Sequence, residues 1–99
     1  MPSAAEVHHS KFPVDEVLYD HDGFSIAWGV YDGERRCLGM RWNGEEGDAG
    51  YPKLFKNPVW FVLPAELTIP ILKSLLDTPT DHSGVLKVLG ELEKAGELK

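Results

Sequence analysis

The chain has 99 residues, one cysteine, a formal net charge of -6 and 42% hydrophobic residues. This length is typical of one domain, and the composition is too apolar for a disordered chain. A lone cysteine excludes an intramolecular disulfide framework. The longest apolar run, residues 59–63, is far shorter than the roughly 20 residues of a membrane span. No apolar segment follows Met1, so we expect no signal peptide and a cytoplasmic protein.

The N-terminal half predicts a tail followed by three strands. Residues 1–11 show no periodicity and predict a flexible tail, which leaves residues 12–99 as the single domain. Alternating side chains predict strands over residues 14–19, 24–31 and 36–43. Turns rich in Asp and Gly separate these strands. In the first strand, Val17 and Tyr19 should lie on the face opposite Leu18.

The turn between the second and third strands decides which side chains are paired. A two-residue turn at residues 32–33 would pair Trp28 with Cys37, which sets a large side chain against a small one. A three-residue loop, or a two-residue turn with a bulge, pairs Trp28 with Leu38, and we favour this register. One face of the sheet then carries large apolar groups. The other face, which we call the small face, should receive a helix or a partner chain; it holds Ala27, Gly29, Cys37 and Gly39.

The C-terminal half predicts a long loop, a fourth strand and one or two helices. Residues 43–58 are rich in Gly and Pro and lack any period, which predicts the loop. Residues 59–63 are apolar on both faces, so this strand should be central or covered on both sides. The order of these elements predicts an α+β fold, with a four-stranded antiparallel sheet followed by C-terminal helices.

The first helix is expected over residues 65–76 and contains a proline. Either Thr68 caps the helix and Pro70 lies in its first turn, which we favour, or the helix starts at Pro64 and kinks. Asp81 or Ser83 should cap a second helix. Its apolar stripe is formed by Val85, Leu86, Leu89 and Leu92. This stripe, together with residues 59–63, offers more apolar surface than so small a domain covers, which predicts a homodimer.

Motifs for catalysis, metal binding and nucleotide binding are missing. Cys37 is better explained as a small buried hydrophobe than as a nucleophile. His21 lies between Asp20 and Asp22, but three successive side chains rarely converge on one ion. The glycines of the long loop are interleaved with acids, which would repel a phosphate. We therefore name no catalytic residue, metal or cofactor, and expect a binding protein rather than an enzyme.

Basic and aromatic side chains interleave at the end of the third strand and in the long loop. The candidate binding residues are Arg41, Tyr51, Lys53, Phe55 and Lys56. Such a pattern suits single-stranded nucleic acid, because cations follow the phosphates while rings stack on the bases. The alternative is structural: Trp42 alternates with Met40 and would belong to the core, while the two loop aromatics would anchor the loop.

The strand order and three segments resemble the positive cofactor four family of transcriptional coactivators. The first segment is Leu-Gly-Met-Arg at residues 38–41, the second is the basic part of the loop with Pro52, Lys53 and Lys56, and the third is residues 59–67. The resemblance implies a single-stranded DNA-binding domain with four curved antiparallel strands and a helix. It also implies a dimer formed through the helix and the sheet.

Three functional hypotheses follow from the sequence. The favoured one is a protein-interaction module, an acidic adaptor or inhibitor, because the acids at residues 15–22 and 45–48 suit a basic partner. The second is binding of single-stranded nucleic acid through the candidate residues, since residues 24–63 carry no net charge. The third is a small-molecule binder or enzyme with residues 43–58 as a lid.

Overall fold

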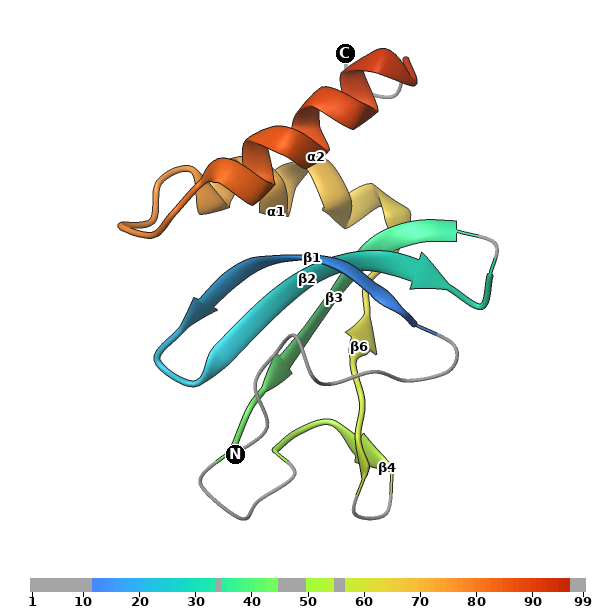
Figure 1. Ribbon diagram of the computed structural model, residues 1–99, viewed down its shortest axis with the longest axis vertical. Coiled ribbons are helices and arrows are strands. Elements are labelled where there is room, and N and C mark those ends of the chain that lie inside the picture. The colour runs from blue at the N-terminus through green and yellow to red at the C-terminus, as the bar shows by residue number, and fades with distance from the viewer. Residues whose placement is uncertain (1–11, 34, 45–49, 55–56, 97–99) are drawn as a thin grey trace.

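The computed structural model describes residues 12–33, 35–44, 50–54 and 57–96. It confirms the predicted α+β fold, a four-stranded antiparallel sheet followed by two helices (Figure 1). The sheet has the order β1 (Val14–His21), β2 (Phe24–Tyr31), β3 (Arg35–Trp42) and β6 (Phe61–Val62). A separate pair of short strands consists of β4 (Lys53–Leu54) and β5 (Asn57–Pro58). Of the helices in the described part of the chain, none is long and apolar enough to cross a membrane.

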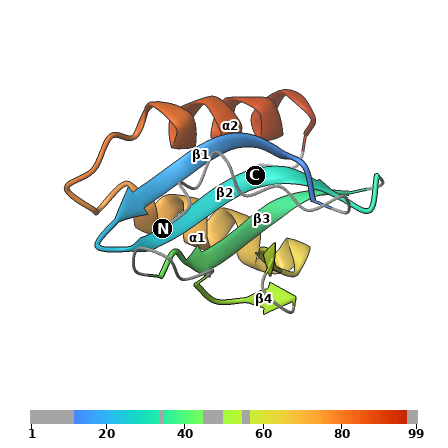
Figure 2. The same ribbon diagram turned by 60° about the horizontal axis from the view of Figure 1, so that its bottom comes forward.

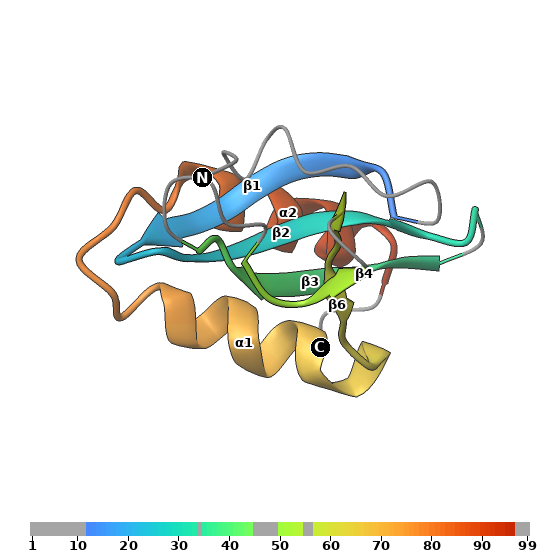
Figure 3. The ribbon, with the colours of Figure 1, turned by 90° about the horizontal axis from the view of Figure 1, so that it is seen from below.

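Both helices lie on the same side of the sheet (Figure 1). The 3-10 turn η2 (Ala65–Leu67) leads into α1 (Thr68–Leu75), and α2 (Ser83–Lys94) follows. In Figure 2 α2 follows the β1 side of the sheet, and in Figure 3 α1 follows the β3 side. The two helices therefore divide one face of the sheet between them.

The predicted register of the second hairpin is confirmed. Trp28 pairs with Leu38 and Tyr31 pairs with Arg35, so a three-residue loop joins β2 to β3. Directly paired residues share a face, and the large apolar side chains are therefore gathered on one side. Gly33 in this loop has a φ of 71°, the left-handed conformation expected there.

In β1 the prediction that Val17 and Tyr19 share a face is wrong. The pairing with β2 shifts register between these two residues, which marks a β-bulge. Leu18 is buried in the core under the helices, and Tyr19 packs against the same core. Val17 packs on the opposite side of the sheet. Simple alternation fails here because a bulge inserts one residue into the period of two.

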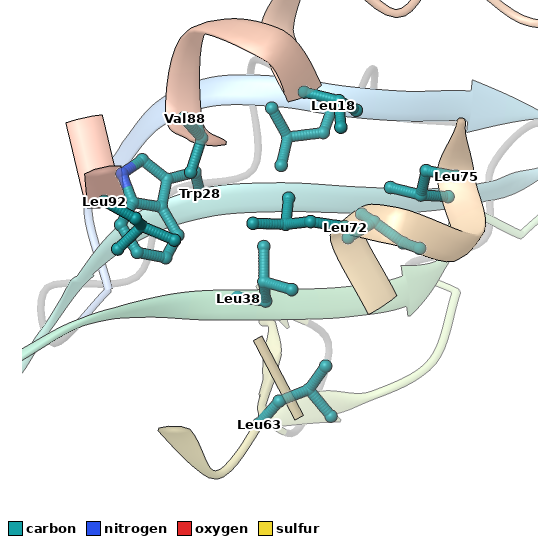
Figure 4. Packing of buried hydrophobic residues seen from close by; sticks show 10 residues of the cluster. Leu18, Trp28, Leu38, Leu63, Leu72, Leu75, Val88 and Leu92 are labelled. Carbon is teal, nitrogen blue, oxygen red and sulfur yellow. The ribbon is translucent and has the colours of Figure 1, made fainter. Parts of the chain in front are cut away.

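The main core fills the space between the sheet and the helices (Figure 4). Its buried residues are Leu18, Ile26, Trp28, Leu38, Leu63, Leu72, Leu75, Val85, Val88 and Leu92. In α2 the inward residues are spaced by three and four positions, as one helical face requires. Leu86, which the sequence placed on this stripe, is 58% exposed, because it lies about 100° around the helix from Val85.

The starts of the helices differ in part from the predicted caps. Pro70 lies in the first turn of α1, as we favoured. The N–H groups of a first turn have no acceptor within the helix, so a proline there costs no helical hydrogen bond. The N-cap position is Leu67, not Thr68, and no side chain caps this helix. At α2 the backbone N–H of Ser83 donates to Asp81 Oδ1 at 3.0 Å. The N-cap residue of α2 is nevertheless His82, whose side chain forms no capping hydrogen bond, so neither Asp81 nor Ser83 is the N-cap, contrary to the prediction.

The expectation that a helix or a partner chain covers the small face is wrong. Phe12 and Trp60 cover it instead, 1% and 6% exposed, with ring centroids 6.1 Å apart. They pack on Ala27 and Cys37, which are fully buried. A Cβ on Gly39 would lie 2.8 Å from the Phe12 ring, so only glycine lets this ring approach the sheet.

Of the two alternatives for residues 59–63, a central strand is wrong, and cover on both faces is confirmed in part. The strand β6 is an edge strand that pairs only with β3 within the described sheet, but Trp60 and Leu63 are buried on opposite faces. Trp60 points to the small face and Leu63 to the main core, so the run is apolar on both sides. Phe61 is nevertheless 56% exposed, because the helices do not extend over this corner of the sheet.

Candidate binding surface

Three aromatic side chains are exposed together at the end of the large-residue face. Trp42, Tyr51 and Phe61, here called the aromatic patch, are 56%, 68% and 56% exposed. Trp42 ends β3, which in Figure 1 ends below the helices, with β4 beyond it. The patch therefore begins where helical cover of the sheet stops.

Backbone pairing holds the three rings on one face. Trp42 and Tyr51 form an isolated antiparallel bridge, with N–H···O distances of 2.7 and 2.8 Å in the two directions. Phe61 is paired with Met40 on the neighbouring strand. Because paired residues of antiparallel strands project to the same side, all three rings lie on the face that carries Met40.

A shallow hollow of about 140 Å³ lies between the rings. Phe24 and Met40 contribute to its floor, and both also pack against the main core. The Phe24 and Trp42 rings are edge to face, with centroids 4.6 Å apart. The hollow therefore lies directly on the main core, and the close packing of that core supports its floor.

Arg41, the first candidate residue from the sequence, lies beneath this surface and is only 1% exposed. Its Nη1 donates to the carbonyl oxygens of Pro52, at 3.3 Å, and Val59. Burial lowers the pKa of its guanidinium, although an arginine stays protonated at neutral pH. Arg41 therefore ties β3 to the segment that carries Tyr51.

The other candidate residues are separated by the structure. Tyr51 is part of the aromatic patch, and Lys53 is exposed in β4 two residues further on. Phe55 and Lys56 lie outside the described residues. The sequence analysis missed Phe61, and it noted Trp42 in the interleaved pattern but left it out of the candidate residues as a core residue. Strand alternation alone could not show that helical cover ends before these two positions.

The β1–β2 turn lies beside the patch. The backbone N–H of Asn43 donates to the carbonyl of Gly23 at 2.7 Å, which holds this turn next to Trp42. The turn carries the exposed Asp22. Asp20 accepts a hydrogen bond from Ser25 at 3.1 Å, and because Ser25 pairs with Arg41, the Asp20 carboxylate lies on the opposite face of the sheet.

The turn also contains the histidine weighed as a metal ligand. His21 lies 3.3 Å from Asp22 and is directly paired with Phe24 on β2. Among the described residues, no group of three or more potential metal-ligating side chains comes together. The chemistry of this end of the molecule is therefore that of aromatic rings beside an acidic turn.

Comparisons with known proteins found no matching family model, no similar curated protein and no similar solved structure.

Proposed function

We propose that this protein is a non-enzymatic protein-interaction module whose aromatic patch binds a basic, partly apolar segment of another protein. One observation carries the proposal: three aromatic side chains, each more than half exposed, lie on one face around a common apolar hollow. Trp and Tyr supply much of the binding energy in protein interfaces, because they bury large areas with few rotatable bonds.

The charge of the chain supports a basic partner. Asp22 lies in the turn beside the patch, and the chain as a whole carries a net charge of -6. Such a field attracts a cationic segment and accelerates its encounter with the surface. An arginine of the partner could stack on Trp42 or Tyr51 as a cation–π pair while a neighbouring cation contacts the Asp22 carboxylate.

Peptide display tests this proposal without knowledge of the partner. Random peptides are selected on the immobilised protein, and the recovered sequences are measured again on variants. We expect sequences rich in Arg, Lys and apolar residues. Their binding should fall by about 30-fold, or 2 kcal/mol, on Trp42→Ala or Tyr51→Ala.

Tyr31→Ala provides the matched control. Tyr31 is 38% exposed and ends β2 at the opposite end of the strand from Phe24, so its loss should leave the affinity unchanged. Circular dichroism verifies that each variant is folded. The proposal fails if the selected peptides are acidic, or if they bind the Trp42 and Tyr51 variants as tightly as the wild type.

Single-stranded nucleic acid is the second candidate ligand, because exposed Trp and Tyr rings also stack on bases. The burial of Arg41 and the adjacent Asp22 weaken this alternative, since phosphates need accessible cations. A fluorescence titration with a short mixed-sequence strand, at low and physiological salt, distinguishes the two. Of the three tryptophans only Trp42 is exposed, so quenching that weakens with salt would favour the nucleic acid.

A further inference from the structure

A second hollow lies at a different part of the molecule. It has a volume of about 860 Å³ and lies between the C-terminal half of α2, the start of α1 and the strands β2 and β3. Figure 1 shows α2 diverging from the sheet toward its C-terminal end. Pockets that hold small organic ligands are typically about 300–1,000 Å³. The hollow, here called the α2 groove, contains no residue of the aromatic patch and none of the predicted lid at residues 43–58.

The floor of the groove offers an unused hydrogen-bond donor. Trp28 lines the groove and is only 3% exposed. In Figure 4 its ring lies beside Val88 and Leu92, with the indole nitrogen on the α2 side and away from Leu72. This Nε1 has no acceptor among the described residues. A buried donor without a partner costs about 1–3 kcal/mol, which a ligand with a suitably placed acceptor would recover.

Charged side chains line the rim of the groove. Arg36 forms ion pairs with Glu91, at 3.2 Å, and with Asp15, at 2.6 Å. Arg35 also lines the groove, but it lies two residues before Cys37 in β3, and its side chain interacts with Cys37 on the opposite face of the sheet. Lys94 forms no ion pair within the described residues, so it is the cation of the rim that a ligand can engage.

Apolar side chains supply the remaining walls. Leu92, Ile69 and Ala65 line the groove between its floor and its rim. A ligand that fits must therefore combine an apolar body with a negatively charged acceptor group. We propose that the α2 groove binds a small organic anion of this kind, a carboxylate that accepts the Trp28 indole proton and faces Lys94. This inference does not depend on the function proposed for the aromatic patch.

Octanoate is a suitable probe, and the indole N–H resonances of the isotope-labelled chain report where it binds. The three resonances are assigned with the variants Trp28→Phe, Trp42→Phe and Trp60→Phe. If one variant is unfolded, the other two are sufficient for the assignment. We expect the Trp28 resonance to shift and saturate at millimolar octanoate while the other two stay in place. Uncharged 1-octanol should bind about tenfold more weakly, which corresponds to about 1.4 kcal/mol for the lost charge interaction.

Surface variants test the role of the rim. Lys94→Gln should weaken octanoate binding about fivefold, because the charge interaction at the rim is removed. Lys73→Gln on α1 is the control, since this exposed lysine is not part of the groove. Ala95→Leu should also weaken binding, by filling the groove without removing a charge.

The proposal is overturned if the Trp28 resonance does not move, or if octanol binds as tightly as octanoate. It is also overturned if Lys73→Gln weakens binding as much as Lys94→Gln does. A shift confined to Trp42 would place the probe on the aromatic patch and not in the groove. The readouts for the two surfaces are therefore separate, and either proposal can fail alone.

Discussion

At the scale of single residues, Arg41 shows how a surface-type side chain becomes part of the interior. Arg41 follows Met40 in an alternating strand, so its side chain projects to the small face. There it lies under the loop segment that contains Gly50 and Pro52. Gly50 closes over it: a Cβ there would lie 2.6 Å from Arg41 Nη2 and 2.1 Å from the Trp42 carbonyl oxygen. The buried guanidinium thus organises the aromatic patch without being part of its surface.

Replacement of Arg41 should therefore reduce stability before it affects any ligand. Arg41→Met keeps an apolar stem but removes the donors to the Pro52 and Val59 carbonyls. We expect the free energy of unfolding to fall by about 3 kcal/mol, measured by urea denaturation, because hydrogen bonds from a charged group are lost. The control Arg35→Met, at an exposed position, should change it by less than about 0.5 kcal/mol. Equal losses in both variants would contradict this role.

At the scale of elements, the start of α2 depends on one carboxylate. Asp81 is exposed, and its hydrogen bond from the Ser83 backbone lowers its pKa below the ordinary 3.8. A carboxyl with a lower pKa in the folded state stabilises the protein above its unfolded pKa. This contribution is lost as the pH falls through the folded value, when the acceptor becomes protonated.

The stability difference between wild type and Asp81→Ala should therefore depend on pH. We expect the variant to be less stable near neutral pH, and the difference to shrink as the pH falls below about 4. Thermal denaturation followed by circular dichroism from neutral to acid pH measures this. Glu93→Ala, elsewhere on α2, controls for the loss of a negative charge. A difference that is constant with pH would contradict the assigned hydrogen bond.

At the scale of the whole molecule, the chain covers both faces of its own sheet. Phe12 reaches the small face from the beginning of the described chain and buries Cys37. Burial raises the pKa of the Cys37 thiol, so little of it is the reactive thiolate at neutral pH. The second, smaller cluster is therefore as much a part of the fold as the helical core.

Removal of the Phe12 ring should open this face. Phe12→Ala should lower the free energy of unfolding by about 3–5 kcal/mol, as for other buried phenylalanines. The rate at which Cys37 reacts with a thiol reagent under native conditions should rise in parallel. Phe61→Ala, which removes an exposed ring, should leave that rate unchanged. If Cys37 reacts equally fast in wild type and Phe12→Ala, this ring does not protect it.

The homodimer predicted from the sequence remains a prediction at this scale. Leu86, from the α2 stripe behind that prediction, is 58% exposed and would be buried in a contact between copies. Light scattering at tens of micromolar measures the oligomeric state. We expect a dimer that Leu86→Lys disrupts, because burying an unpaired charge in an interface is costly. A monomeric wild type would end the dimer prediction.

The candidate site was less predictable from the sequence than the fold. Tyr51 and Lys53 were identified by their interleaved pattern, and both are exposed. Trp42 and Phe61 could not be identified in the same way, because period-two patterns give the face of a residue and not what covers that face. Arg41 shows the opposite error. An arginine is usually exposed, but the loop that lies over Arg41 buries its side chain.

The sequence by itself determined the order of elements, the hairpin register and the separation of large from small side chains. These follow from local physics: turn residues, alternation and the three-residue loop that pairs Trp28 with Leu38. Only the tertiary structure decided where the helices stop, that Phe12 and Trp60 cover the small face, and that residues 59–63 lie at an edge. Burial is a property of contacts between segments distant in sequence. The same apolar side chain is therefore a core residue or part of a binding surface, depending on which element packs over it.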